Sequence, residues 1–279
     1  MKIYPIQNVI QESNIIVFSP HYDDFLLMLG GYVSELRSEG LLGTKKFHIN
    51  LLFSYSNYLA GSGAGNFDTS LERIKAATGK RIIEDLECVN ELLGRFNYNY
   101  EIFGEDECFV RGKPFAESEM EFPHGMYADF NEKDKEIFTR MKKLIRKWAS
   151  KEDTALIFPM AIKEHIDHFI VRQAAIEVAK ETTGNVNSKF YFQEDKPYGG
   201  IATSEELTRI EDFIKENKLE DRLYSYDPEA IIELAFRHYI SQVEEVYKKG
   251  IKDRALYLKN KMNSPLPLDR ICLFNRNQD

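Results

Sequence analysis

The chain is organised around the stretch Ser19-Pro20-His21-Tyr22-Asp23-Asp24, which places one imidazole and two carboxylates within four positions. The run before it, 14–18 (NIIVF), is apolar and rich in β-branched residues, which predicts a buried strand. The run after it, 25–29 (FLLML), leads into a predicted helix that ends near Gly40. Ionisable groups this close repel, lose solvation or share a cation. The carboxyl end of a strand is also where open α/β sheets bind ligands.

A second cluster of the same kind follows a second apolar run. The stretch Glu164-His165-Ile166-Asp167-His168 comes after 155–159 (ALIFP) and also opens a helix. Three of the six histidines in the chain lie in these two clusters. A capping carboxylate and a loop histidine would explain either cluster alone. Together they supply His, Asp and His for a divalent metal, and three protein ligands beside an open position is the arrangement of catalytic zinc.

Composition limits the classes of protein that this chain can represent. With 279 residues, 43% hydrophobic and 29% charged, it can bury a sizeable core as a globular protein. A formal net charge of -8 argues against nucleic acid as the main partner. No apolar run approaches the ~20 residues of a membrane span, and the start lacks the apolar core of a signal peptide. Cys88, Cys108 and Cys272 form no CxxC pair and predict reduced thiols in a cytoplasmic protein.

Strand and helix candidates alternate along most of the chain, without a repeat or a linker, which predicts a single α/β domain over residues 1–279 with a mainly parallel sheet. Further strands are predicted at 47–53, 100–103 and 189–192, with an edge strand at 223–226. Helices are predicted at 70–94, 133–150, 169–181 and 204–218, and from Pro228 through Val246. His48, inside the strand at 47–53, is interpreted as structural.

The two histidine motifs carry a family resemblance. His21-Tyr22-Asp23-Asp24 resembles the His-Pro-Asp-Asp motif of the LmbE-like (PIG-L) zinc-dependent N-deacetylases, and His165-Ile166-Asp167-His168 resembles their His-Pro-Asp-His motif. Tyr22 and Ile166 stand where proline is usual, and Phe25 stands where glutamate often follows, but no ligand or catalytic position is lost. Weaker similarity extends over nearly the whole chain. The resemblance implies a three-layer α/β/α sandwich with a Rossmann-like, mainly parallel sheet.

The resemblance also assigns roles at the metal. It implies His21, Asp24 and His168 as ligands of Zn²⁺, and the same nitrogen and oxygen donors suit Fe²⁺. Asp23, which cannot easily turn toward the same ion as its neighbour, is left as the base that takes a proton from the attacking water. The products would be acetate and a free amine, and the family's usual substrates are small N-acetylglucosamine conjugates.

Four further residues receive expected roles. His165 is placed to donate to the oxyanion or the leaving amine, and Asp167 is expected to bond to His165, raise its pKa and keep it protonated near neutrality. Arg81 resembles a substrate-facing arginine, although a solvated helix pair with Asp85 at i+4 is an equal alternative. Asp106 resembles an aspartate that contacts substrate hydroxyls, although a loop carboxylate needs no function.

Other functions stay open on the sequence. An amidase acting on a longer acyl group or a non-sugar amine would use the same residues, and a non-catalytic sugar-binding or metal-storage relative would need fewer of them. The glycine-rich loop 60–66 (AGSGAGN) does not have the GxGxxG spacing of a nucleotide site and is expected to be a lid. The irregular stretch 113–130 is expected to be a lid or a binding loop. A homo-oligomer is compatible with the sequence.

Overall fold

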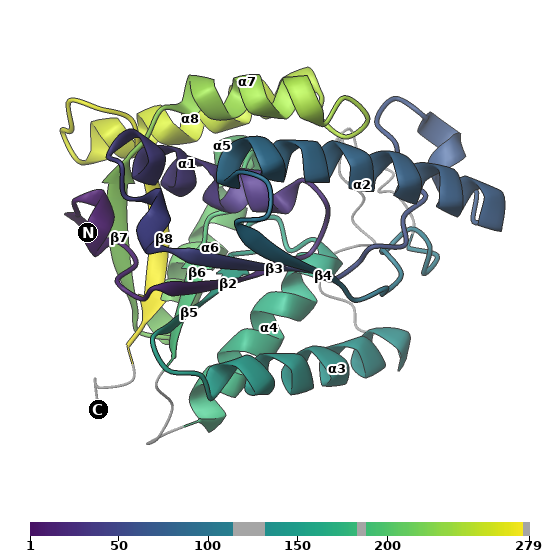
Figure 1. The fold of residues 1–279 in the computed structure, drawn as a ribbon, viewed down its shortest axis with the longest axis horizontal. Coiled ribbons are helices and arrows are strands. Elements are labelled where there is room, and N and C mark those ends of the chain that lie inside the picture. Colours follow the sequence, from purple (N-terminus) through teal and green to yellow (C-terminus); the bar gives the residue numbers. More distant parts are fainter. Residues whose placement is uncertain (114–131, 183–187, 276–279) are drawn as a thin grey trace.

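The computed structural model describes residues 1–113, 132–182 and 188–275, and their strands form one eight-stranded sheet (Figure 1). The strand order is β1-β7-β8-β6-β5-β2-β3-β4. Only β8 runs antiparallel to its neighbours, so the expected mainly parallel sheet is confirmed. The strands are β1 (Lys2–Ile3), β2 (Asn14–Ser19), β3 (Lys46–Leu51), β4 (Tyr98–Ile102), β5 (Thr154–Pro159), β6 (Lys189–Gln193), β7 (Leu219–Ser225) and β8 (Leu268–Phe274).

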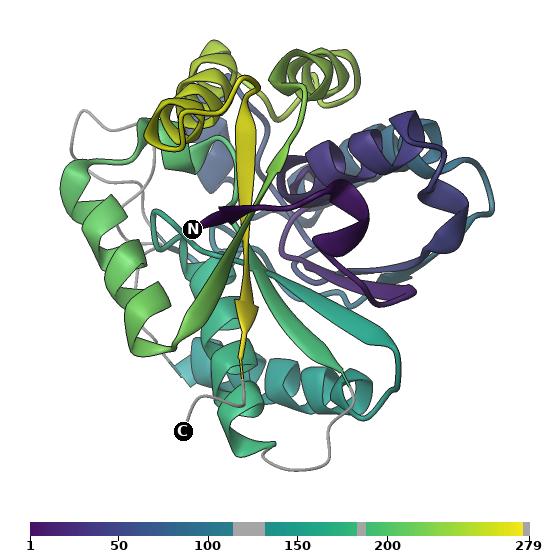
Figure 2. The same cartoon turned by 90° about the vertical axis from the view of Figure 1, so that its left-hand side faces the viewer.

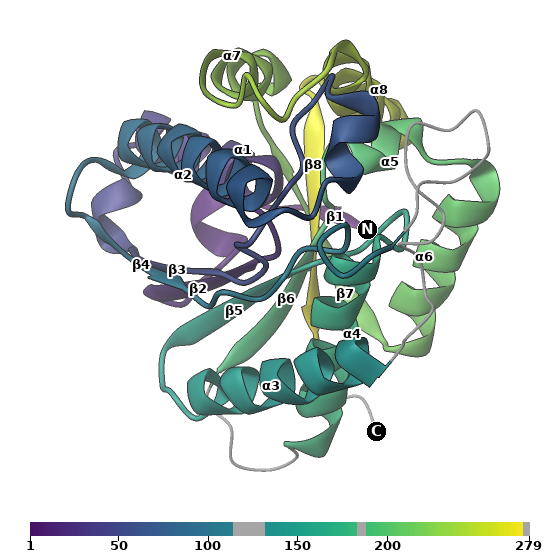
Figure 3. The ribbon, with the colours of Figure 1, turned by 90° about the vertical axis from the view of Figure 1, so that its right-hand side faces the viewer.

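Helices cover both faces of this sheet. One core lies under α1, α2, α7 and α8, and a second lies under α3, α4 and α6. Figures 2 and 3 show these two helical layers from opposite ends of the sheet, which is the expected three-layer sandwich. The helices are α1 (Asp24–Ser38), α2 (Leu71–Leu93), α3 (Glu132–Ala149), α4 (Ile166–Glu181), α5 (Tyr198–Ile201), α6 (Ser204–Glu216), α7 (Pro228–His238) and α8 (Glu245–Lys261), with short 3-10 helices at Ile6–Asn8, Leu42–Thr44 and Gly63–Phe67.

The central strands β2 and β5 bring the two histidine motifs together. In β2, Ile15 and Val17 face the core under α1, whereas Ile16 and Phe18 face the core under α4. Burial on both faces explains why these runs are continuously apolar. The two strands pair in parallel, and the Phe18 ring stacks on the Phe158 ring with centroids 4.7 Å apart. Their carboxyl ends therefore lie at the same edge of the sheet, and each motif follows directly.

The carboxy-terminal third differs from the expectation in its strands. The strand predicted at 223–226 is β7, but its predicted place at an edge is wrong, because β7 lies between β1 and β8. Strand β8 was not predicted, because its sequence 268–274 (LDRICLF) carries two adjacent charges near its start. Both charges are buried with partners, since Lys196 donates to Asp269 at 2.6 Å and Arg270 donates to Glu194 at 2.6 Å.

The predicted helix from Pro228 through Val246 is two helices, because α7 ends at His238 and α8 begins at Glu245. Between them, the Ser241 hydroxyl donates to Glu84 at 2.7 Å and the Gln242 amide donates to the same carboxylate at 3.0 Å. Glu84 lies on α2 and is buried. A buried carboxylate is costly to leave without donors, so these contacts outweigh continued helix formation.

The two expected loops have different outcomes. Most of the stretch 113–130 lies outside the described residues, which exclude 114–131. The glycine-rich loop includes the 3-10 helix Gly63–Phe67, and the Ala60 N–H donates to the Ser241 carbonyl at 2.7 Å. Its role as a lid stays a prediction. In the described part of the chain, no helix has the length and apolarity that crossing a membrane requires.

Candidate metal centre

Three potential metal ligands lie in, or just before, the first turns of two helices. His21 follows β2, Asp24 is the first residue of α1, and His168 lies in the first turn of α4. The turn at His21 is closed locally, because its N–H donates to Asp24 Oδ2 at 2.8 Å and its carbonyl accepts from the Ser19 hydroxyl at 2.9 Å. All three candidate ligands are buried.

The donor atoms of these three residues form a small triangle. His168 Nε2 lies 3.3 Å from His21 Nδ1 and 3.2 Å from Asp24 Oδ2, and the third side, from His21 Nδ1 to Asp24 Oδ2, is 3.5 Å. A tetrahedral ion with bonds of 2.0–2.2 Å separates its ligand atoms by about 3.3–3.6 Å. The sides of the triangle lie within about 0.1 Å of this range, so the donor set fits one Zn²⁺ or Fe²⁺ ion.

Each candidate ligand histidine is backed by a buried carboxylate. Asp167 Oδ2 lies 2.9 Å from His21 Nε2, and Asp195 Oδ2 lies 2.9 Å from His168 Nδ1. These contacts occupy the ring nitrogens that face away from the triangle and so orient the other two toward it. Asp195 was not predicted as part of the site, because it lies outside the two histidine motifs.

The Asp167 carboxylate does not bond to the His165 ring as expected. Its Oδ1 lies 2.7 Å from Arg111 Nη2, and its Oδ2 accepts from the Cys108 N–H at 3.0 Å and contacts His21. Burial opposes ionisation, but the Arg111 charge and the His21 hydrogen bond hold the pKa of Asp167 well below its usual value. Asp167 is therefore a charged partner of a candidate ligand, and that corrects the expected role.

The adjacent carboxylates Asp23 and Asp24 have opposite electrostatic environments. Burial opposes ionisation of both, but the neighbouring His168 and His21 hold the pKa of Asp24 well below its usual value. For Asp23, burial and the charge of Asp24 raise the pKa to about 6, although Arg81 and His21 act against this. Arg81 Nη2 lies 3.9 Å from Asp23 Oδ1. Asp23 stands outside the donor triangle, as a base would.

The surroundings of His165 favour its neutral ring, contrary to the expectation that it holds its proton near neutrality. Burial and the charge of His21 lower its pKa well below 6.5. Its Nδ1 accepts from the Asp167 N–H at 3.3 Å, so the neutral ring carries its proton on Nε2. The Asp167 charge raises this pKa, as expected, but it does not outweigh burial and His21, because the carboxylate contacts His21 and Arg111 and not the His165 ring. A neutral imidazole can still donate a hydrogen bond to a developing negative charge.

Arg81 is buried beside the centre. Its Nη1 donates to Ser56 Oγ at 2.6 Å and to Glu107 at 2.9 Å, and its Nε donates to Gln242 at 2.8 Å. The solvated helix pair with Asp85 is therefore wrong, since Arg81 is only 3% exposed. A direct contact of Arg81 with substrate stays a prediction.

Asp106 lies in the loop beside the centre but is exposed. Its backbone carbonyl accepts from Arg111 Nη1 at 2.6 Å, and its contact with substrate hydroxyls stays a prediction. The neighbouring Glu107 is the residue that points inward, with Oε1 3.8 Å from His21 Nε2 and a bond to Arg81. Sequence reasoning missed Glu107, because neighbouring acidic residues in a loop carry no signal for which one is buried.

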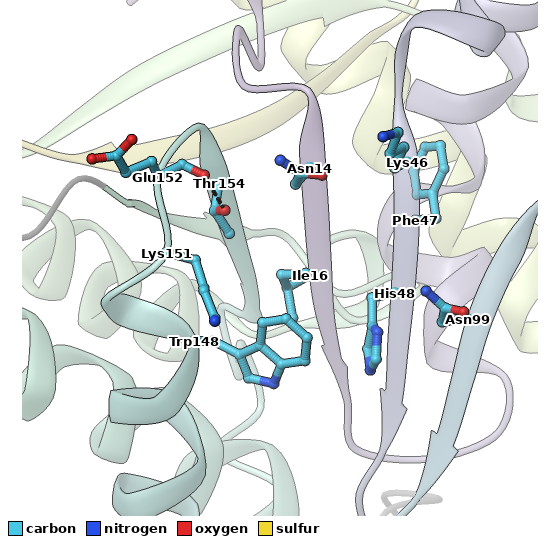
Figure 4. Close-up of a pocket in the computed structure, with 10 residues that line it drawn as sticks. All are labelled: Asn14, Ile16, Lys46, Phe47, His48, Asn99, Trp148, Lys151, Glu152 and Thr154. Atoms are coloured by element: carbon cyan, nitrogen blue, oxygen red, sulfur yellow. Dashed lines mark hydrogen bonds between the residues drawn. The ribbon is translucent and has the colours of Figure 1, made fainter.

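A separate pocket of about 320 Å³ lies at the opposite end of the strands (Figure 4). Asn14, Lys46 and Thr154, which are the first residues of β2, β3 and β5, contribute to its lining. His48 packs there against Trp148, with ring centroids 4.5 Å apart. This packing agrees with the structural interpretation of His48, and the pocket is not part of the candidate metal centre.

The fold and the centre together define a class: an α/β protein with a His₂Asp donor triangle at the carboxyl edge of its sheet. No family model and no curated protein matches the chain. Solved structures do match. The chain is similar to the zinc-inhibited form of teicoplanin deacetylase Orf2, with a TM-score of 0.58 and 17% identity over 95% of this chain and 99% of that chain.

Two further structures show the same similarity. The A40926 pseudoaglycone deacetylase Dbv21 has a TM-score of 0.56 and 15% identity over 96% of this chain and 99% of that one. The N,N'-diacetylchitobiose deacetylase from Pyrococcus horikoshii has a TM-score of 0.56 and 14% identity, over 97% of this chain and 87% of that one. The chain thus has the fold of LmbE-like (PIG-L) deacetylases, so the resemblance in the two motifs is confirmed at the level of the fold.

Proposed function

We propose that this chain is a metal-dependent N-deacetylase that hydrolyses the acetamide of an N-acetylated sugar to acetate and a free amine. The observation that carries the proposal is the donor triangle of His21, Asp24 and His168, with sides of 3.2–3.5 Å, beside a carboxylate that is not part of it. The shared fold supports it. We propose Zn²⁺ as the ion, with Fe²⁺ as the second candidate.

A bound ion at this triangle would polarise the amide carbonyl and acidify the attacking water. Asp23 would accept the proton of that water and later deliver it to the leaving amine. Arg81 Nη2, at 3.9 Å, would keep the Asp23 carboxylate oriented. The neutral His165 would donate its Nε2–H to the oxyanion of the tetrahedral intermediate. The water oxygen joins the acyl carbon, the C–N bond breaks, and the amine leaves with the transferred proton.

The substrate class is part of the same proposal. A solved structure of the same fold is a diacetylchitobiose deacetylase, which favours an N-acetylglucosamine-type sugar for this chain. We propose Arg81 and Asp106 as substrate-binding residues, since one lies beside Asp23 and the other is exposed next to the inward-facing Glu107. We also propose that residues 1–279 act as a single domain in the cytoplasm. All described strands share one sheet, and the three cysteines form no disulfide.

The test measures the free amine, and for the N-acetyl substrates also the acetate, that chelated protein releases from a panel of amides after Zn²⁺ or Fe²⁺ is returned to it. The panel contains N-acetylglucosamine, diacetylchitobiose, a longer N-acyl glucosamine and an N-acetylated amine without a sugar. We expect metal-dependent acetate release from the N-acetyl sugars, slower by about 10²–10⁴-fold in an Asp23→Asn control. Turnover of only the longer acyl chain or the non-sugar amide would instead assign an amidase. Metal binding without any turnover would point to a sugar-binding relative. Separately, light scattering of the same preparation gives the oligomeric state of the protein.

A further inference from the structure

A sulfur ligand lies beside the proposed oxyanion donor. Cys108 Sγ is 3.8 Å from His165 Nε2, and both side chains are buried, with 0% and 8% of their surface exposed. The other two cysteines have different surroundings, since Cys272 donates to Asp221 and Cys88 lies by Tyr239. The ligand atoms of Cys108, His165 and Asp167 all lie within 4.8 Å of one another. Sulfur and imidazole nitrogen together select thiophilic ions such as Zn²⁺ and Cd²⁺.

We propose that Cys108, His165 and Asp167 form a second cation site, which fills after the donor triangle and inhibits the enzyme. Tetrahedral zinc with one sulfur and one nitrogen ligand separates these two atoms by about 3.6 Å. The observed separation of 3.8 Å needs only a small closure. On binding, a bond from sulfur to the metal replaces the S–H bond, and the thiol proton leaves to the buffer.

The contacts of Asp167 make this second site the weaker one. Its Oδ1 is paired with Arg111 Nη2 at 2.7 Å, and its Oδ2 is shared between His21 and the Cys108 N–H. A second ion must therefore share a carboxylate that already has three partners, and it must approach the Arg111 charge. Among the residues that the structure describes, no Arg or Lys side chain is paired with Asp24 of the donor triangle, so the triangle fills first.

The second ion would inhibit because it binds His165 Nε2, and this inhibitory role rests on the proposed function. His165 Nε2 would be the hydrogen-bond donor to the oxyanion. For a metal to bind this nitrogen, the ring proton moves to Nδ1, and the hydrogen bond that Nδ1 accepts from the Asp167 N–H is lost. Losing one oxyanion donor typically costs on the order of 10²-fold in turnover. We expect a loss of that size when the second site is saturated.

The binding test uses metal-free full-length protein titrated with Cd²⁺, whose bond to a thiolate gives a near-ultraviolet charge-transfer band. We expect the band to appear after the first equivalent in the native protein. It should be absent in Cys108→Ser, which should also retain one equivalent of metal fewer by elemental analysis. Cys88→Ser and Cys272→Ser are matched controls that replace a different buried cysteine, and both should keep the band. If Cys108→Ser fails to fold, a band that persists in both control variants still assigns the thiolate to Cys108 by elimination. A native protein without the band, or a band lost in Cys88→Ser, would overturn the second site.

The activity test compares acetate release at one equivalent of Zn²⁺ with release at a large excess. In the native protein we expect acetate release at the large excess to be slower than release at one equivalent, by a factor on the order of 10². In Cys108→Ser the two rates should be similar. Excess Mg²⁺, which prefers oxygen ligands, should not inhibit. Equal zinc inhibition of both proteins would overturn the inhibitory role. If no substrate is turned over, the proposed function fails while the cadmium result still decides whether the site exists.

Discussion

At the scale of single residues, the centre separates the roles of groups that the sequence places side by side. Asp24 shares the donor triangle with two imidazoles, whereas Asp23 points toward Arg81. Asp167 and Asp195, which are 28 positions apart, both support a candidate ligand histidine at 2.9 Å. Chemical identity alone does not distinguish these four carboxylates, but their contacts do.

The first prediction concerns the adjacent pair. Asp23→Asn should keep its metal and lose about 10²–10⁴-fold in turnover, because a general base is removed while the ligands stay. Asp24→Asn should lose the metal, because it removes one corner of the triangle. Elemental analysis and acetate release on both variants measure this. A metal-free Asp23→Asn beside a metal-loaded Asp24→Asn would reverse the two roles.

The second prediction concerns the carboxylates behind the histidines. Asp167→Asn and Asp195→Asn should each weaken metal binding about 10–100-fold, the usual cost of removing such a partner. Competition with a chromophoric chelator gives the affinities, and the exposed Asp253→Asn is the matched control. Unchanged affinity in both variants would mean that these carboxylates do not orient the ligands.

At the scale of elements, α2 links the centre to the turn between α7 and α8. Arg81 and Glu84 on this helix bind Gln242 and Ser241, and Asp85 accepts from the hydroxyls of Tyr100 and Tyr239. These buried contacts explain why the chain leaves its helix after His238. Helix α2 therefore fixes the position of Arg81 beside Asp23 and also that of the turn between α7 and α8.

The third prediction tests the buried pair on α2. Arg81→Met leaves the Glu107 carboxylate buried without its main partner, and removing one member of such a pair typically costs about 3–5 kcal/mol in unfolding free energy. Arg237→Met, which breaks exposed pairs with Glu91 and Glu233, should cost less than about 1 kcal/mol. Urea denaturation compares the two variants. A similar small loss in both would show that the buried pair contributes little.

The fourth prediction is a pH dependence of stability set by Asp85. Burial raises its pKa to about 7 in the folded chain, although the Tyr100 and Tyr239 hydroxyls act against this. A raised pKa means that the folded state binds this proton more tightly. The stabilisation is therefore fully present below the unfolded pKa of ~4 and is lost as pH rises toward 7. Asp85→Asn should remove this part of the slope, so the native protein should lose more stability than the variant between pH 4 and pH 8. Parallel urea curves at both pH values for the two proteins would contradict it.

At the scale of the whole molecule, the metal would join parts of the chain that are far apart in sequence. His21 and His168 are separated by 147 positions, yet their facing nitrogens are 3.3 Å apart. Central strands β2 and β5 create this proximity because they pair in parallel. An ion bound there would stabilise the folded state, since the unfolded chain does not hold the three donors together.

The fifth prediction follows from that linkage. Zn²⁺ at 100 times its dissociation constant should stabilise the native protein by ~2.7 kcal/mol, visible as a rise in Tm on adding metal to chelated protein. His168→Ala should show no such rise, while His238→Ala, whose ring pairs with Glu91 at the surface, should behave like the native protein. A metal-dependent rise that survives in His168→Ala would place the main ion elsewhere.

The sequence by itself determined the local framework of the protein. Apolar runs at 14–18 and 155–159 form β2 and β5, and the motifs that follow them meet at one edge of the sheet. Strands that are buried on both faces lie in the interior of a sheet, and parallel neighbours have their carboxyl ends at the same edge of that sheet. The helix beginning at Leu71, with Ser70 capping its N-terminus, is equally local, because its signals lie within a few residues of each other.

Only the tertiary structure decided which of several equivalent side chains face one another. It paired Asp167 with His21, lowered the pKa of His165, turned Glu107 inward instead of Asp106, and ended α7 where Ser241 meets Glu84. It also buried the charges of β8 against Glu194 and Lys196. Each choice depends on a partner dozens of positions or more away. A buried charge is stable only beside that partner, and local sequence carries no record of its distance or direction.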